Sequence, residues 1–556
     1  MNRLQPRGLL LAAECWAGDR ISEQIRSHHR RRLRRVGWEH SLDAPAGGWA
    51  DGDLPVRGRN DLEVIIDGAD ALPAIADEVR RATSHVHLTG WFFSPDFQLE
   101  REPDHCLLRN LLADLAERIP VRVLTWAGAP LPLFRLSRGE VREMHEKLTS
   151  GTKIDCRLDA RERPLHCHHE KTIVVDDRVA FVGGIDLTTE SGDRYDTQEH
   201  PSRASVGWHD VCTRISGPAV ADVADHFWMR WADVAGEALP PVVAPPDAGG
   251  LDLQVVRTVP ESLYAGAPRG VFTILESYLR ALRAAERLIY IENQFLLSPE
   301  VAAVLAHLLR THPNPDFRLL LLLPSKPNSG ADDTRGLLGD LIEADADAGR
   351  LLACTIYARS GRLVDPIYVH AKVAVVDDAW LTVGSANLNE HSLFNDTEMN
   401  VVSHDPQLAT RTRLRLWAEH LELPIERIPT DPTRAIDELW KPISEEQLDR
   451  RTAGEPLTHR LARLPHVSRR TGRALGPSAG SSSTASWSPA VRQVTSWRSL
   501  RHPDRSSWTA AAPTIGSSGS GSAVGWRMKA RVWGPPIPPW NEMSSSKAQP
   551  SSSCAS

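Results

Sequence analysis

The sequence has little cysteine, no long apolar run and no excess of basic charge, and each absence excludes a class of protein. Seven cysteines among 556 residues are scattered and odd in number, and none forms a CxxC pair. This excludes a disulfide framework and a paired-cysteine zinc site. The longest aliphatic run, Leu319 to Leu323, is far shorter than the roughly 20 residues of a transmembrane helix. A formal net charge of −6 excludes a whole-molecule basic field for nucleic acid.

The composition that remains is that of a folded protein. Hydrophobic residues make up 41% and charged residues 24%, so we expect order over most of the length. The length allows three or four domains, or a duplicated pair with extensions. Near the start, the apolar stretch from Gly8 to Ala13 is too short for a signal peptide and is interrupted by Glu14. We therefore expect a cytoplasmic or peripheral membrane protein.

The two ends of the chain differ in composition from its middle. Residues 26–35 (RSHHRRRLRR) form a basic cluster within an expected N-terminal basic arm, 1–60. The cluster either contacts anionic lipid headgroups or nucleic acid, or belongs to a solvated arm. Residues 466–556 are rich in Ser, Gly and Pro without periodicity, with eleven Lys and Arg against two Asp and Glu. Such a segment cannot bury enough apolar surface to order, so we expect a disordered tail without chemistry.

An internal repeat organises the middle of the chain. Residues 169–188 and 370–389 are identical at nine of twenty positions without a gap, at an offset of 201. Upstream of each copy, helical and strand patterns follow in the same order. The expected helices are 68–83 and 270–287, and the expected strands are 85–93 and 287–295, 121–126 and 317–324, and 153–158 and 351–358. The pattern predicts two pseudo-symmetric α/β domains, each a mostly parallel sheet flanked by helices, with the active site at their interface.

The domain boundaries follow from the repeat. We expect the first half over 61–245 and the second half over 246–430, with a Pro/Gly-rich linker around 236–268. A C-terminal helical extension is expected over 431–465.

Each repeat carries a histidine and a lysine two residues apart at the start of an apolar run. In a strand, residues i and i+2 face the same side, so His169 and Lys171 project together, as do His370 and Lys372. Lysine is suited to phosphate oxygens, and histidine can act as nucleophile, acid or base near neutral pH. Two such pairs facing each other predict a two-step displacement at phosphorus through a phosphohistidine, without a metal or another cofactor.

Further residues accompany each pair. Asp176 and Asp377 follow the apolar runs, and the next strands end in Gly183-Gly184 or Gly384-Ser385. Small residues there are expected to let a ligand approach the backbone closely. Asn387 and its counterpart Asp186 are expected to help hold the non-bridging phosphate oxygens.

The pattern His-x-Lys-x4-Asp followed by Gly-Gly or Gly-Ser, present twice, resembles the phospholipase D superfamily. YIENQF (290–295), WHDVCTRISGPAV (208–220) and DTEMNV (396–401) are similar to its phospholipase D branch. The resemblance covers about residues 60–430.

The resemblance implies a role for each residue of the pattern. His169 is the implied nucleophile and His370 the implied acid and base, although near-symmetry allows the reverse order. The phosphate ligands are Lys171 and Lys372, the residues that fix strands and side chains are Asp176 and Asp377, the substrate-binding positions are Gly183, Gly184, Asp186, Ser385 and Asn387, and the carboxylates that orient the imidazoles are Asp210 and Glu398. Asp186 stands where the pattern usually has Asn, which leaves the symmetry of phosphate binding open.

The implied function is hydrolysis, or transphosphatidylation, of glycerophospholipids to phosphatidic acid and a free alcohol. The alternatives are a cardiolipin-synthase-like phosphatidyltransferase, a nuclease-type phosphodiesterase and a lipid-binding protein without turnover. The expected partner is phospholipid at a membrane surface, with no nucleic acid, and the expected oligomeric state is a monomer.

Three features remain open in the sequence. His166, Cys167, His168 and His169 look like a metal-ligand set, but no complementary group stands at a recognisable spacing. Glu292 is either a site contact or a structural ion-pair partner. The loop 190–207 is expected to form the wall that selects the headgroup.

Overall fold

The structure of the protein is a computed structural model. It describes residues 6–100, 106–130, 136–163, 166–188, 207–237, 240–325, 333–360 and 363–465. The tail predicted to be disordered, 466–556, lies outside the described residues, as does nearly all of the predicted headgroup loop 190–207.

Seven strands of the first half form one sheet. Their spatial order is β6 (Asp155–Asp159), β5 (Val121–Trp126), β2 (Val86–Gly90), β7 (Thr172–Val175), β8 (Val179–Gly183), β10 (Val211–Ser216) and β1 (Arg57–Ile66). The first three are parallel to one another, and every later neighbour is antiparallel.

The second half repeats this order. Its strands run β15 (Leu351–Ser360), β14 (Arg318–Leu322), β13 (Leu288–Glu292), β18 (Val373–Val376), β19 (Trp380–Gly384), β20 (Glu398–Ser403) and β11 (Leu251–Val259). Again the first three are parallel. The predicted α/β class is confirmed, and the parallel strands are those joined by crossover helices. The repeated segment adds antiparallel strands because its two strands are joined by a three-residue turn, so each complete sheet is mixed.

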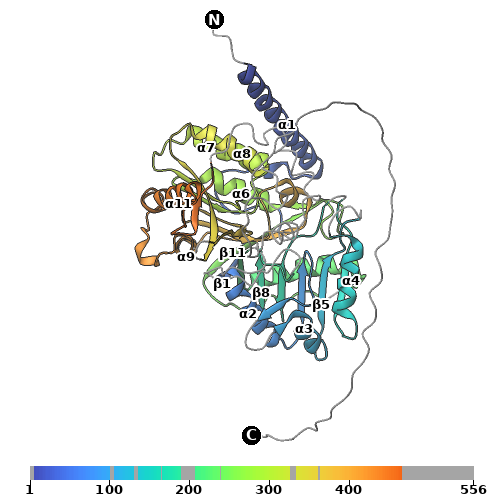
Figure 1. The fold of residues 1–556 in the computed structure, drawn as a ribbon. Coiled ribbons are helices and arrows are strands. Elements are labelled where there is room, and N and C mark those ends of the chain that lie inside the picture. Colours follow the sequence, from blue (N-terminus) through green and yellow to red (C-terminus); the bar gives the residue numbers. More distant parts are fainter. Residues whose placement is uncertain are drawn as a thin grey trace, which may run out of the picture. The chain divides into compact units, whose positions relative to one another are not determined.

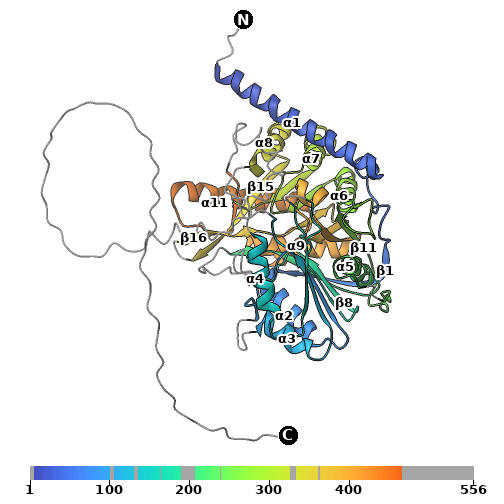
Figure 2. The ribbon, with the colours of Figure 1, turned by 90° about the vertical axis from the view of Figure 1, so that its right-hand side faces the viewer.

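Helices cover the two sheets in layers (Figures 1 and 2). Flanking the sheets are α2 (Asp67–Arg80), α3 (Leu108–Ala116) and α4 (Arg138–Thr149) in the first half, and α6 (Thr273–Ala284), α7 (Pro299–Thr311) and α8 (Asp333–Asp345) in the second. The helices α5 (Ala219–Ala235) and α9 (Pro406–Leu421) contribute to a central core that both halves share. In this core Val174 and Val182 of the first half join Val375, Val383 and Trp417 of the second.

The two sheets join where β1 pairs with β11, antiparallel. This strand lies inside the segment 236–268 that the sequence predicted to be a linker, so that prediction was wrong for residues 251–259. The preceding prolines mark the true connection, whereas LDLQVVRTV is held as a strand by pairing with β1 on one side and β20 on the other. A second junction pairs β9 (Trp208–His209) with β17 (Tyr368–Val369), parallel.

The remaining elements are short or peripheral. They are η1 (Glu39–Ser41), β3 (Gln98–Glu100), β4 (Cys106–Leu107), β12 (Val271–Phe272), β16 (Leu363–Pro366), η2 (His391–Asn395), η3 (Ile425–Arg427), α10 (Pro432–Ala435), η4 (Ile436–Trp440), α11 (Lys441–Ala453) and β21 (Leu461–Arg463). The predicted extension 431–465 is therefore helical up to residue 453, and β21 then pairs with β15.

The basic cluster at 26–35 is not a solvated arm. It forms the last turns of α1 (Pro6–Val36), and His29 and Arg32 are buried against the second half. Arg32 donates to the carboxylate of Glu261 at 2.6 Å and to Oδ1 of Asn395 at 2.7 Å. None of the helices among the described residues combines the length and apolarity that crossing a bilayer requires.

We expect Arg32→Ala to lower the free energy of unfolding by about 2 kcal/mol, because the change removes a buried charge and leaves Asn395 without its donor. The loss stays below that of an isolated buried pair because Arg163 also holds Glu261, at 2.9 Å. Urea denaturation measures the change. The control is Arg34→Ala, which removes an exposed arginine and should change the free energy of unfolding far less; equal effects of the two variants would contradict the buried role.

Candidate active site

The histidine of each repeat bonds to a carboxylate of the other half. Nδ1 of His169 lies 2.8 Å from Oε1 of Glu398, and Nδ1 of His370 lies 2.7 Å from Oδ2 of Asp210. All four side chains are buried. Each imidazole is therefore oriented through Nδ1, by a partner 229 positions away for His169 and 160 for His370, and Nε2 is the ring nitrogen turned away from that carboxylate.

Backbone hydrogen bonds hold this exchange in register. The amides of His169 and Glu170 both donate to the carbonyl of Thr397, at 3.0 Å each. The amide of His370 donates in the same way to the carbonyl of His209, at 2.8 Å. Thr397 directly precedes Glu398, and His209 directly precedes Asp210. Each histidine is thus fastened to the residue beside its carboxylate, so the two halves interleave at the site.

Both lysines of the repeats turn back toward their own motifs. Lys171 donates to the carbonyl of His169 at 2.6 Å and lies 3.4 Å from Asp186. Lys372 donates to the carbonyl of His370 and lies 3.5 Å from Oε1 of Gln294. The ammonium group of Lys171 therefore has the carboxylate of Asp186 as a neighbour, whereas that of Lys372 has the amide of Gln294.

The surroundings hold His169 in its neutral form. Burial lowers the pKa of His169 well below its ordinary value of 6.5, and the charges of Lys171 and Lys372 lower it further. Burial also raises the pKa of the Glu398 carboxyl well above 4.5. Both lysines are thus close enough to act on one imidazole, and that imidazole keeps a lone pair at neutral pH.

The small residues after each repeat make room for other parts of the protein. A Cβ atom on Gly184 would lie 2.0 Å from Oδ1 of Asp210, and one on Gly183 would lie 2.6 Å from Cα of Cys212. The Ser385 hydroxyl donates to Glu398. Gly184 and Ser385 thus serve the carboxylates that orient the histidines, and the contact of these positions with the substrate stays a prediction.

We expect Gly184→Ala to lower kcat by about tenfold to a hundredfold, because the new methyl group displaces Asp210 and disturbs the hydrogen bond to His370. A steady-state assay of the purified variant measures the loss. The matched control is Gly139→Ala, where the added Cβ meets nothing closer than 3.8 Å. Wild-type turnover by Gly184→Ala would show that Asp210 tolerates the displacement.

Asp176 and Asp377 lie away from the four histidine and lysine side chains. Each follows its strand, in a turn of left-handed backbone with φ of 56° and 52°. Asp176 accepts the backbone amides of Thr83, Ser84 and His85, and Asp377 accepts those of residues 286–288. They fasten the repeat to the start of the neighbouring antiparallel strand, β2 or β13, at the end of β7 and β18 opposite to the lysines.

Several polar residues outside the predicted set also support the site. Gln294 accepts from Asn387 at 3.2 Å as well as from Lys372, and Ser392 donates to Glu398 at 2.5 Å. Gln294 stands in the YIENQF segment, which was the signal for it. Nothing local marks Ser392, whose role depends on where η2 places it.

Glu292 is a structural ion-pair partner rather than a site contact. Its carboxylate lies 2.7 Å from Nε2 of His209 and 2.9 Å from Nε2 of His420. His209 also lies 3.0 Å from Asp67, which accepts the backbone amide of Asp210. Burial opposes a charge on His209, but the two carboxylates outweigh it and raise its pKa well above 6.5.

The side chains of residues 166–169, which the sequence suggested as a metal-ligand set, contact different partners. His166 lies 2.9 Å from Nδ1 of His391 and 3.5 Å from Asp396. His168 lies 3.0 Å from the Thr397 hydroxyl. The metal-like set of the sequence is therefore not one ligand group, although His166, His391 and Asp396 form a new one across the two halves.

This chain is similar to one family model and to several known proteins. The family model described as phospholipase D matches residues 354–448. Phospholipase D A of Dictyostelium discoideum is 25% identical over 470 residues, covering 66% of this chain and 36% of that protein. Phospholipase D1 of Schizosaccharomyces pombe is 25% identical over 501 residues, covering 67% and 36%, and phospholipase D alpha 3 of Arabidopsis thaliana is 25% identical over 555 residues, covering 68% and 67%.

The chain thus spans about a third of the length of the first two relatives. Among solved structures, phosphatidylserine synthase of Haemophilus influenzae Rd KW20 superposes with a TM-score of 0.45 at 14% identity, covering 76% of this chain and 98% of that one.

Proposed function

Because the chain belongs to the phospholipase D superfamily, we propose that it is a phosphodiesterase that cleaves glycerophospholipids to phosphatidic acid and a free alcohol. The observation that carries the proposal is the exchange of partners between the halves, His169 with Glu398 and His370 with Asp210. Two oriented imidazoles with two lysines beside them supply a nucleophile, an acid and a phosphate-binding charge in one place.

The first step is displacement of the alcohol by His169. Its Nε2 lone pair attacks phosphorus and forms a P–N bond while the P–O bond to the alcohol breaks. His370, as the imidazolium, gives its proton to the departing oxygen. Burial and the lysines hold His169 in the neutral form that a nucleophile needs, which supports this assignment.

The second step releases phosphatidic acid. His370, now neutral, takes a proton from water, the water oxygen attacks phosphorus, and the P–N bond breaks to restore His169. An alcohol in place of water gives a new phosphodiester, so transphosphatidylation uses the same groups. Lys171 and Lys372 stabilise the charge on the non-bridging oxygens in both steps.

We propose phospholipid at a membrane surface as the substrate, and a monomer as the active form, because one chain carries both histidine–lysine pairs. The net charge of −6 disfavours nucleic acid as an alternative substrate.

The test is turnover by the purified full chain against three substrates, with His169→Ala as the inactive control. Phosphatidylcholine vesicles with and without ethanol, phosphatidylglycerol vesicles and single-stranded DNA are assayed in parallel. We expect choline release and, with ethanol, phosphatidylethanol. Diglycerophospholipid formation alone would establish a phosphatidyltransferase instead, nucleotide release alone a nuclease, and no turnover of any substrate would overturn the proposed activity.

A further inference from the structure

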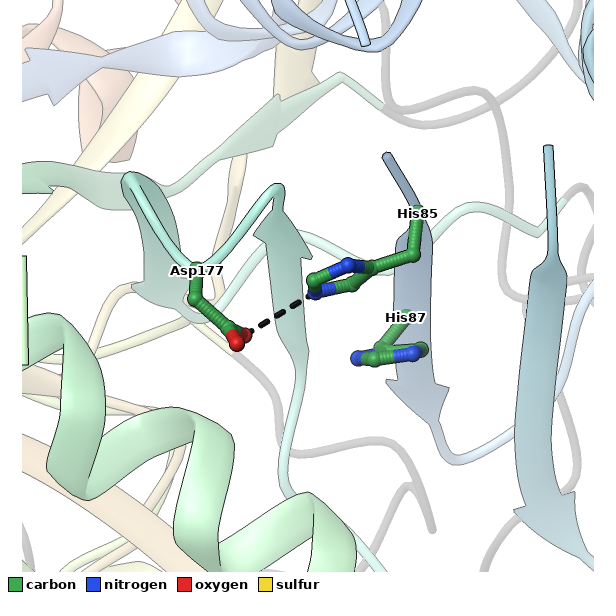
Figure 3. A group of neighbouring side chains, drawn as sticks. All are labelled: His85, His87 and Asp177. Atoms are coloured by element: carbon green, nitrogen blue, oxygen red, sulfur yellow. Dashed lines mark hydrogen bonds and ion pairs between the residues drawn. The ribbon is translucent and has the colours of Figure 1, made fainter. Parts of the chain in front are cut away.

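Two histidines and an aspartate meet at the far end of the first repeat, away from the lysines (Figure 3). His87 lies on β2 and His85 just before it, two positions apart, so both rings lie on one face of the sheet. Asp177 comes from the turn between β7 and β8, where its backbone is left-handed with φ of 49°. Its Oδ1 lies 3.0 Å from Nε2 of His85.

His87 is the unexplained member of this group. Its side chain is 1% exposed, and neither ring nitrogen has a hydrogen-bond partner among the described residues. A buried polar group without a partner costs about 1–3 kcal/mol. The ring stacks between His85 at 4.3 Å and Phe227 at 4.5 Å, with Trp228 at its edge. These neighbours keep water away without satisfying the two nitrogens.

The second half shows that the fold does not need histidines here. By strand register, His87 pairs with Val174 as Tyr290 pairs with Val375, so Tyr290 is the equivalent of His87. Leu288 then corresponds to His85. The equivalent of Asp177 is Asp378, which is taken by Arg413 at 2.6 Å. At this place the second half has Leu288, Tyr290 and the ion pair of Asp378. The first half has three possible metal ligands instead.

We propose that His85, His87 and Asp177 bind one divalent transition-metal ion, with zinc as the best match. Their three ligand atoms lie within 4.8 Å of one another. Two imidazoles and one carboxylate suit zinc and its neighbours, whereas calcium and magnesium prefer oxygen ligands. A tetrahedral ion with bonds of about 2.1 Å holds its ligand atoms about 3.4 Å apart, a value between the 3.0 Å from Nε2 of His85 to Oδ1 of Asp177 and the 4.8 Å that bounds the group, so small side-chain movements suffice to bind it.

The surroundings supply what such a site needs. The Ser84 hydroxyl lies 3.0 Å from Nδ1 of His85, so it can accept a hydrogen bond from Nδ1–H, which leaves the Nε2 lone pair for the metal. Phe227 and Trp228 form an apolar wall on the other side. The ion would fasten the start of β2 to the turn after β7, the same joint that Asp176 closes through three backbone amides. Its role is structural, and it stands apart from the proposed phosphodiesterase chemistry.

The test is zinc binding by the full chain after treatment with a chelator and removal of the chelator. Isothermal titration with zinc chloride gives stoichiometry and affinity, and cobalt(II) absorption reports histidine ligation. We expect one zinc ion bound with the highest affinity, binding about a hundredfold weaker in His87→Phe and in Asp177→Asn, and a zinc-dependent rise in melting temperature that both variants lose. Phenylalanine keeps the stacked ring, and asparagine keeps the shape of the carboxylate.

The matched control is His391→Asn, which alters another group of possible ligands, formed with His166 and Asp396 across the two halves. It should bind zinc as the wild type does. Unchanged zinc affinity in His87→Phe would overturn the proposal, as would a wild type that binds no zinc. If His87→Phe does not fold, unchanged zinc affinity in Asp177→Asn would overturn the proposal.

Discussion

The His169→Ala variant is expected to lose about 10⁴-fold or more in kcat, and His370→Ala about 10² to 10⁴-fold. The first change removes the proposed nucleophile, and the second removes the proposed acid and base. Both variants should also lose some thermal stability, since each change leaves a cavity and a buried carboxylate without its imidazole partner, so turnover is compared below the melting temperature of each variant. Steady-state turnover of phosphatidylcholine and thermal melting measure the two quantities.

A substrate with a good leaving group separates the two histidines. In para-nitrophenyl phosphocholine the nitrophenolate group leaves without an acid. His370→Ala should therefore still form the phosphohistidine, which carries the phosphocholine group, and should accumulate it because it lacks a base for water. Peptide mapping should then find the phosphoryl group on His169. Accumulation in His169→Ala instead would reverse the order of the two residues.

Cys167→Ser is the neighbouring control for the histidine variants. Its Sγ donates to Asp396 at 3.5 Å, a hydrogen bond that a serine hydroxyl can replace, so turnover should stay near the wild-type value. Full activity in either histidine variant would contradict the mechanism.

Lys372→Met is expected to lower kcat/KM by about 10² to 10³-fold and to shift the acid limb of the pH profile upward. The loss follows from removing a charge that stabilises the non-bridging oxygens. The shift follows from the pKa of His169, which burial and both lysines hold well below 6.5. Activity requires neutral His169, so the wild type should stay active below pH 6.5. Removing one ammonium raises the pKa of His169, and the half-maximal point moves to higher pH.

Lys171→Met should move the acid limb in the same direction, because both ammonium groups act on the same imidazole. The control is Lys147→Met, which removes an exposed lysine that pairs with Glu143 at 2.9 Å. It should leave both rate and profile unchanged. An acid limb that stays in place in both site variants would show that the lysines do not act on His169.

Much of the fold and of the site could be predicted from local sequence patterns. The alternation of strands and helices predicted β5 to the residue and placed α2, α6 and β13 within a few residues of their observed bounds. The i, i+2 spacing placed His169 beside Lys171, because successive side chains of an extended chain alternate in direction. These properties depend on residues close in sequence, and a local pattern is enough to determine them.

Other features depend on long-range contacts. The strand β11 stood next to a proline-rich segment and was taken for linker, because its pairing with β1 and β20 cannot be seen locally. Likewise, the glycines of the repeats looked like room for a ligand, but Gly184 makes room for Asp210.

Two copies of one motif, and the side chains that each copy presents, follow from the amino-acid order alone, since duplication and strand periodicity are properties of the chain. The folded arrangement was needed to show that each histidine takes its carboxylate from the opposite half, and that His85, His87 and Asp177 meet at one end of the first sheet. Hydrogen bonds and ligand sets form at about 3 Å, and the number of residues between two atoms does not fix their distance in space.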